Sequence, residues 1–310
     1  MMKLKLIVVF AVLVCFSCRD KDKHGNIVDT ATSGTIKIAV DESLKPLIEA
    51  EVMAFEGIYQ QAHLEVVYTS EAKAIEDLMN DSVRLAIVTR QLTESEREPF
   101  KRAKITPTES NIGMGAVAII LNNASKDTVI RVSQLKDILT GKITKWNQIN
   151  GSKDNTPIEV IFDNPASGIA RFLRDSLAGG QKLPSNCFAV NGNQEVIDYI
   201  SKKTNAIGFI GSEWISDSSD SQANKFLKTI RVAGLAGDSS YFLPYQAYVA
   251  MRQYPLCRNT WILSREARAG LGTGFTSFVA GEKGQRIVLK AGLVPKTMPI
   301  RIVEINRTNN

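Results

Sequence analysis

Histidine and cysteine are scarce in this sequence, which limits the chemistry that the chain can carry. Its 310 residues include two histidines and four cysteines, and no HExxH or CxxC spacing occurs, so we expect no zinc site. No GxSxG, GxxxxGKS or GxGxxG pattern follows an expected strand, and these patterns mark hydrolase nucleophiles and nucleotide sites. We therefore expect no cofactor, no metal and no enzyme activity.

Charge of one sign is also not concentrated anywhere in the chain. There are 38 basic and 32 acidic residues, for a formal charge of +6. The two signs are interspersed, with no Lys/Arg run dense enough to follow a nucleic-acid backbone, so nucleic-acid binding is not expected. The apolar fraction of 44% is enough to bury real cores, which excludes disorder of the whole chain.

The sequence has one apolar run near its start, of about a dozen residues, which is short for a membrane span but suits a signal-peptide core. Ser17 and Cys18 end the run, and a charged stretch follows. This order resembles a bacterial lipobox, so we expect residues 1–17 to be removed, Cys18 to be lipidated and 18–33 to form a tether at the cell envelope. The alternative is an ordinary secretory peptide with an incidental cysteine.

Two cysteines, Cys187 and Cys257, remain in the expected mature chain. An oxidising compartment would allow them to pair. A bond between moving lobes would impede their opening, however, and two free, partly buried thiols are the favoured interpretation.

Expected strands and helices alternate along the chain. Each expected strand is a short apolar or β-branched run followed by a segment of helical periodicity, and the capping-box spacing of Thr93 and Glu96 marks one helix start. The strands are expected at 35–40, 63–69, 85–89, 158–162 and 206–210. This alternation favours parallel sheets with helices on both faces.

The pattern restarts after the apolar run at 113–122, which predicts a second α/β unit. We expect one lobe from 34–117 plus 245–310 and the other from 118–244. Residues 245–252 are expected to cross back as a strand, followed by a long amphipathic helix that carries Phe275. Two lobes joined by two crossing strands form a hinge, because few backbone residues must absorb the closure.

Three expected strand-to-helix turns carry a serine where the helix begins, namely Ser43, Ser70 and Ser167, the last followed by Gly168. Helix N-termini expose unpaired N–H groups and a positive dipole end, and together these bind anions. Such turns gather at the carboxyl ends of the strands in an open α/β sheet, where ligands bind. Each serine alone is more often a plain helix cap, but three in one pattern favour an oxyanion site.

The order of these motifs resembles the substrate-binding proteins of phosphate ABC transporters, over about residues 34–300. The most family-specific segment is LKDILTGKITKWNQI, with Gly141 and Trp146, and the most functional is FDNPASGIARFL. The resemblance implies a two-lobed type II periplasmic-binding-protein fold. It also implies a monomer that captures phosphate or a related oxyanion and delivers it to an ABC permease.

The family's anion contacts can be carried over residue by residue. The resemblance places them at a residue pair in the first turn, a serine in the second and a Ser-Gly pair in the second lobe, which here are Ser43 with Leu44, Ser70, and Ser167 with Gly168. Ile169 replaces the family's threonine, so one hydroxyl donor is lost.

Two charges depart from the family pattern. The family has an aspartate after the third strand and an arginine four residues before the Ser-Gly pair, whereas this chain has Arg90 and Asp163 there. We hypothesise that Arg90 contacts the oxyanion, while Asp163 either orients Arg90 or accepts a proton from a protonated ligand. A surface ion pair between the two is the alternative. Arg171, one turn into the second-lobe helix, is a further candidate.

Acidic residues near the same turns favour a second interpretation. Asp41, Glu42 and Glu71 could bind the amine of an organic ligand or pair with nearby basic residues. A sensor or scaffold of the same fold that binds no ligand or an organic one is therefore the alternative function, and a phosphate-ester hydrolase is a more distant one. The sequence leaves open whether phosphate, another oxyanion or an organic phosphate is bound.

Overall fold

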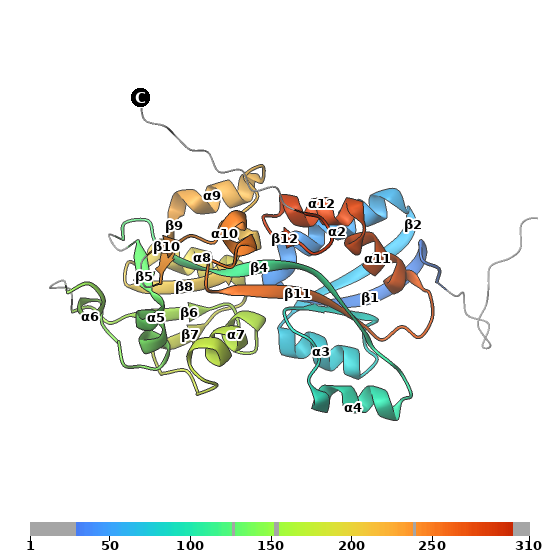
Figure 1. The fold of residues 1–310 in the computed structure, drawn as a ribbon, viewed down its shortest axis with the longest axis horizontal. Coiled ribbons are helices and arrows are strands. Elements are labelled where there is room, and N and C mark those ends of the chain that lie inside the picture. Colours follow the sequence, from blue (N-terminus) through green and yellow to red (C-terminus); the bar gives the residue numbers. More distant parts are fainter. Residues whose placement is uncertain (1–28, 126–127, 152–154, 238–239, 300–310) are drawn as a thin grey trace, which may run out of the picture.

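The computed structural model describes residues 29–125, 128–151, 155–237 and 240–299. These residues form two α/β lobes, and strand β4 (Thr108–Asn122) runs from one lobe into the other (Figure 1). Strand β11 (Cys257–Ser264) pairs antiparallel with the first part of β4. The predicted two-lobed α/β fold with crossing strands is confirmed.

The first lobe is built on a parallel set of strands. β1 (Ser33–Asp41) pairs in parallel with both β2 (Gln61–Thr69) and β3 (Leu85–Val88). β11 joins β3 to β4 in antiparallel pairing, and the short β12 (Val294–Pro295) pairs with β4. The carboxyl ends of β1, β2 and β3 consequently open on one edge, which faces the second lobe.

The second lobe repeats this arrangement. β6 (Glu159–Phe162) pairs in parallel with β7 (Cys187–Ala189) and β8 (Ala206–Gly211), and β8 pairs antiparallel with the second part of β4. The strand order β2-β1-β3-β11-β4-β8-β6-β7 therefore runs continuously through both lobes. A small branch leaves it, in which β9 (Ile230–Ala236) pairs with β4, β5 (Val129–Arg131) and β10 (Tyr241–Phe242).

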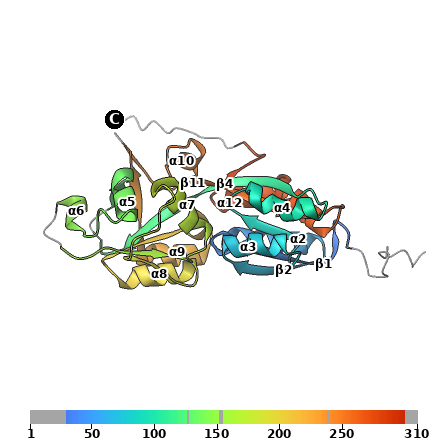
Figure 2. The same cartoon turned by 90° about the horizontal axis from the view of Figure 1, so that it is seen from below.

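Helices cover both faces of each lobe's strands, as Figures 1 and 2 show from two directions. On the first lobe one face carries α2 (Lys45–Ile58), α11 (Leu271–Ala280) and α12 (Glu282–Lys290), and the other carries α3 (Glu71–Met79) and α4 (Glu94–Arg102). On the second lobe the two faces carry α5 (Val132–Leu139) with α7 (Gly168–Leu177), and α8 (Asn193–Lys202) with α9 (Ser221–Thr229). The remaining short helices are α6 (Asn147–Asn150), α10 (Gln246–Ala250) and the 3₁₀ turns η2 (Glu42–Leu44) and η3 (Ser212–Trp214).

Local sequence explains where the helices near the site begin. Ser70 and Ser167 are the N-caps of α3 and α7, and their hydroxyls accept from the amides of Lys73 and Ala170 at 3.3 and 3.1 Å. The predicted capping box of Thr93 and Glu96 starts α4. Side-chain caps at these positions satisfy helix amides that have no intrahelical partner.

One predicted element is wrong. Residues 245–252, expected as the returning strand, contain helix α10, and the strand that returns to the first lobe is β11. The aromatic and β-branched residues of this segment favour a strand locally, but Val249 packs into the second lobe's core together with Tyr254 and Leu256. Tertiary packing thus overrides the local preference.

The predictions for the N-terminus are only partly testable in the structure, whereas the prediction for the two cysteines is tested directly. Cys18 and the expected signal peptide lie outside the described residues, and within the described part no helix is long and apolar enough to cross a membrane. Asp29, expected in the tether, instead binds the amide of Leu271 at 2.6 Å and pairs with Arg268. Cys187 and Cys257 are free and partly buried, as predicted.

Candidate functional site

A polar pocket lies where the turns of the two lobes meet. It has a volume of about 280 Å³. The first lobe lines it with the turns after β1 and β2, and the second lobe with the turn after β6 and the start of α8. The lining residues are Glu42, Tyr68, Thr69, Ser70, Asp163, Asn164, Ser167, Asn191 and Gly192. Three of the predicted site residues, Ser70, Asp163 and Ser167, therefore face the same pocket.

The first turn joins the two lobes through Asp41. One oxygen of this carboxylate, Oδ1, accepts from the amide and the hydroxyl of Ser43 at 2.9 and 2.7 Å. The other, Oδ2, accepts from the amide of Gly168 at 2.9 Å. The amides of Ser43 and Gly168, two of the residues that the sequence assigns to the oxyanion, thus hold one buried carboxylate of the chain itself.

The second turn joins the lobes through Glu71, at the start of α3. Glu71 Oε2 accepts from the amide and the hydroxyl of Thr89 at 2.9 and 2.5 Å. Glu71 Oε1 accepts from Arg171 Nε of the second lobe at 2.5 Å, and Arg171 also donates to Thr89 Oγ1 at 3.1 Å. Arg171 therefore faces the interlobe site, and its anionic partner is Glu71.

A third set of contacts is centred on Asn193, the first residue of α8. Its amide and side-chain Nδ2 donate to Glu42 Oε2 of the first lobe at 2.9 and 2.7 Å. Nδ2 also lies 3.3 Å from Asp163 Oδ2, and the hydroxyl of Ser167 donates to Asp163 Oδ1 at 2.6 Å. Asp163 is thus held by groups of its own lobe.

Arg90 does not have the partner that the sequence suggested. Its guanidinium forms a bidentate pair with Glu96 at 2.6 and 2.7 Å, and its Nε lies 3.5 Å from Glu71 Oε1. Asp163 is not among the ion-pair partners of Arg90 in the described residues. The hypothesis that Asp163 orients Arg90 is wrong, as is the surface-pair alternative, because the capping box of α4 already holds Glu96 beside Arg90.

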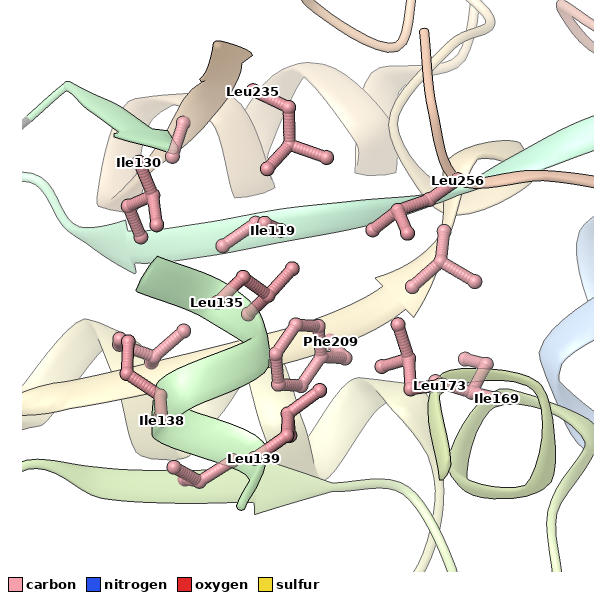
Figure 3. Packing of buried hydrophobic residues seen from close by; sticks show 14 of the residues in the cluster. Ile119, Ile130, Leu135, Ile138, Leu139, Ile169, Leu173, Phe209, Leu235 and Leu256 are labelled. Atoms are coloured by element: carbon pink, nitrogen blue, oxygen red, sulfur yellow. The ribbon is translucent and has the colours of Figure 1, made fainter. Parts of the chain in front are cut away.

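Ile169 and Leu44 serve the cores rather than the pocket. Ile169 is fully buried and points from α7 into the second lobe's core beside Leu173, as Figure 3 shows. Leu44 is equally buried in the core of the first lobe. At the position where the resemblance implies a threonine, Ile169 therefore contributes apolar packing.

Four residues of this site carry no signal that the sequence pattern revealed. Thr89 and Asn193 are described above. Arg258 of β11 donates to Ser43 Oγ at 2.9 Å, and the indole Nε1 of Trp214 donates to the carbonyl of Ser43 at 3.0 Å. No local pattern singled out these side chains, because their partners lie from 18 to 215 residues away along the chain. The one available signal was a buried charge within a strand, since Arg258 is the single charged residue of β11.

Buried carboxyl groups dominate the electrostatics. Burial, and then the charge of Asp41, raise the pKa of Asp163 to about 7. Burial also raises the pKa values of Asp41, Glu42 and Glu213. Burial alone would raise that of Glu71 too, but its hydrogen bonds with Arg171 and Thr89 lower it overall. Glu71 is thus the carboxylate with the clearest cationic partner.

Two lobes with helix N-termini converging on a polar interlobe pocket define a ligand-binding architecture of the hinged type. A family model described as a PBP superfamily domain matches residues 28–283. The chain therefore belongs to the PBP superfamily.

Curated relatives match along most of the chain. The phosphate-binding protein PstS of Borreliella burgdorferi is 24% identical over 297 residues, covering 93% of this chain and 96% of the relative. PstS of Pseudomonas aeruginosa is 20% identical over 291 residues, covering 89% and 86%.

Solved structures show the same fold. A putative phosphate ABC transporter substrate-binding protein with bound phosphate, from Clostridium perfringens, superposes with a TM-score of 0.71 at 22% identity, over 84% of this chain and 99% of that one. A phosphate transport receptor from Vibrio cholerae gives 0.64 at 21%, over 84% and 100%.

Proposed function

We propose that this chain is a solute-binding protein that captures a small oxyanion, with phosphate as the first candidate, between its two lobes. The proposal includes delivery to an ABC permease from outside the cytoplasm, with Cys18 as a lipid anchor and the chain as a monomer. It also retains the predicted lobes, 34–117 plus 245–310 and 118–244, except that Val249, Tyr254 and Leu256 belong to the core of the second lobe. The names of the similar proteins and the match along most of the chain support it.

One observation carries the proposal: the donors of the interlobe site already bind anionic oxygens. The amide of Gly168 and the guanidinium of Arg171 project from α7, and each holds a carboxylate oxygen of the first lobe. Helix-terminal amides and a guanidinium bind phosphate oxygens with the same geometry as carboxylate oxygens. The first turn of α7 therefore offers donors suited to an oxyanion, which supports the proposal.

A calorimetric titration with inorganic phosphate, with sulfate as competitor, tests the proposal. The protein is the whole chain carrying Cys18→Ser, which removes the proposed acylation site. We expect Arg171→Ala to weaken phosphate binding roughly 10-fold or more, because hydrogen bonds to charged groups contribute about 1.5–3 kcal/mol. Arg174→Ala is the matched control, since Arg174 lies on the same helix and pairs with Asp175.

The carboxylate contacts favour a second candidate, a sensor or scaffold that binds no oxyanion. Asp41, Glu42 and Glu71 each accept a hydrogen bond from the second lobe. The donors of the second lobe therefore have acceptors in the first lobe without a bound oxyanion. Absence of heat with phosphate and with sulfate would support this candidate and overturn the first.

Ester hydrolysis is not part of the proposal. A hydrolytic serine needs a base that takes its proton. The hydroxyl of Ser167 donates to Asp163 and caps α7, and no histidine is among the residues that line the pocket. We expect no turnover of phosphate esters.

A further inference from the structure

Three carboxylates of the first lobe reach across the interlobe site. Asp41 accepts from the amide of Gly168, Glu71 from the guanidinium of Arg171, and Glu42 from Asn193. Asp41 ends β1, Glu42 follows it directly, and Glu71 begins α3 just after β2. The hydrogen bonds that a bound oxyanion would make to the second lobe are thus made by carboxylates of the chain.

The contact around Gly168 is close. A Cβ atom at this position would lie 2.5 Å from Asp41 Oδ2, 2.6 Å from Thr89 Oγ1 and 2.8 Å from Glu71 Oε2. All three atoms belong to first-lobe side chains. First-lobe oxygens therefore pack directly against the amide that begins α7, at the place where an oxyanion would have to bind.

These contacts are buried as well as close. Asp41 is 0% and Glu71 2% exposed, and both bonds to the second lobe join an ionisable carboxyl to an amide or a guanidinium. Charge-assisted bonds of this kind are stronger than neutral ones, and a buried donor that loses its acceptor is costly. Separation of the lobes would leave Gly168 and Arg171 without these partners.

We propose that Asp41 and Glu71 form an intramolecular anion, which closes the two lobes by occupying the oxyanion donors of the second lobe. A solute oxyanion then binds by taking Gly168 and Arg171 from these carboxylates. The closing role is independent of the proposed function, and only the competition with a solute rests on it.

This arrangement has a thermodynamic consequence. A ligand shifts a conformational equilibrium only by its differential affinity for the two states. If the chain's own carboxylates already stabilise the closed state, an oxyanion gains only the difference between its contacts and theirs. Removal of a carboxylate should therefore open the lobes and strengthen oxyanion binding.

Glu71→Ala tests both parts of the proposal in the whole chain carrying Cys18→Ser. Small-angle scattering without phosphate should give a larger radius of gyration than for the parent chain, and inorganic phosphate should reverse the increase. Calorimetry should show phosphate binding about 10-fold tighter or more, in line with one charge-assisted bond. Glu76→Ala is the matched control, because Glu76 lies on the same helix in an exposed pair with Lys73.

Gly168→Ala provides a second test, directed at the contact between the lobes. The three atoms nearest to the added methyl group are all first-lobe side-chain atoms, so the methyl group should force the lobes apart. Trp214 reports the separation independently, because its indole contacts the carbonyl of Ser43 across the lobes. Its emission should shift to the red in both variants, and Trp214→Phe in the same background assigns the signal.

The outcomes separate the two proposals. Larger radii for Glu71→Ala and Gly168→Ala, with tighter phosphate binding by Glu71→Ala, support the intramolecular anion. Larger radii without phosphate binding by any variant support the closure and overturn the oxyanion function. Unchanged radii in both variants overturn the intramolecular anion, and phosphate binding by the parent chain then upholds the proposed function alone.

Discussion

Glu51 offers a test of the first lobe's core that is independent of the ligand. It lies on the inner face of α2 between Ile48 and Phe55, and it is 0% exposed. Neither carboxyl oxygen has a hydrogen-bond partner in the described residues. Burial alone raises the pKa of Glu51 from the ordinary 4.5 to about 9. The folded chain therefore holds this carboxyl protonated at neutral pH.

The raised pKa fixes the sign and size of the effect. The protonated form favours the folded state fully below pH 4.5, and this contribution is lost as the pH rises toward 9. Because one pKa unit corresponds to about 1.4 kcal/mol, burial of Glu51 costs about 3 kcal/mol of unfolding free energy at pH 7. Gln at this position does not titrate, so Glu51→Gln should remove the dependence on pH.

Urea unfolding between pH 5 and 8, followed by circular dichroism, measures the difference. The unfolding free energy of Glu51→Gln minus that of the parent should rise by about 1.4 kcal/mol per pH unit. Glu51→Met should have an unfolding free energy about 1–3 kcal/mol above that of Glu51→Gln at every pH, because methionine also removes the two unpartnered oxygens. Glu49→Gln, exposed on the same helix, is the control. A difference between Glu51→Gln and the parent that stays constant with pH would refute the reasoning.

Two further changes test the site and the crossing strand. Burial raises the pKa of Asp163 to about 7, so ionisation of this carboxyl should destabilise the folded chain as the pH rises from about 4 to about 7. Asp163→Asn should therefore flatten the dependence of the melting temperature on pH in that window. An unaltered slope would contradict the assignment. Tyr254→Phe removes a buried hydrogen bond of 2.8 Å to the carbonyl of Val117 and should lower the unfolding free energy by about 1 kcal/mol. The exposed Tyr241→Phe should change it little, and equal losses in both variants would argue against the role of the bond.

Local patterns were sufficient to predict most of the fold. The β-branched run of β1 and the apolar periodicity of α2 and α3 carry their own signals, and the Thr93–Glu96 cap starts α4 where predicted. The exception, α10, is a short segment whose aromatic content favours a strand. Its helical state depends on the packing of Val249 in the second-lobe core. The sequence of a short segment does not reveal that contact.

The site was predictable only in part, for a related physical reason. Helix-cap serines and Gly168 follow from strand-to-helix turns, and the structure brings them together. Side-chain partners are less predictable, because a charged side chain can pair with a residue near it in the sequence or with a distant residue that the fold brings close. Arg90 pairs with Glu96, six residues away, rather than with Asp163, whereas Arg171 reaches Glu71 across 100 residues.

The exchanged charges acquire a consistent explanation from these partners. A capped helix holds the carboxylate of Glu96 beside Arg90, so Arg90 is largely committed to its own lobe. Arg171 is then the cation that faces the first lobe from α7, and it forms an ion pair with Glu71. An oxyanion that replaces Glu71 at Arg171 must also match the buried amide of Gly168, which Asp41 holds. If a solute displaces these carboxylates as proposed, selectivity depends on how well it reproduces both at once, and a tetrahedral oxyanion carries several acceptor oxygens on one centre.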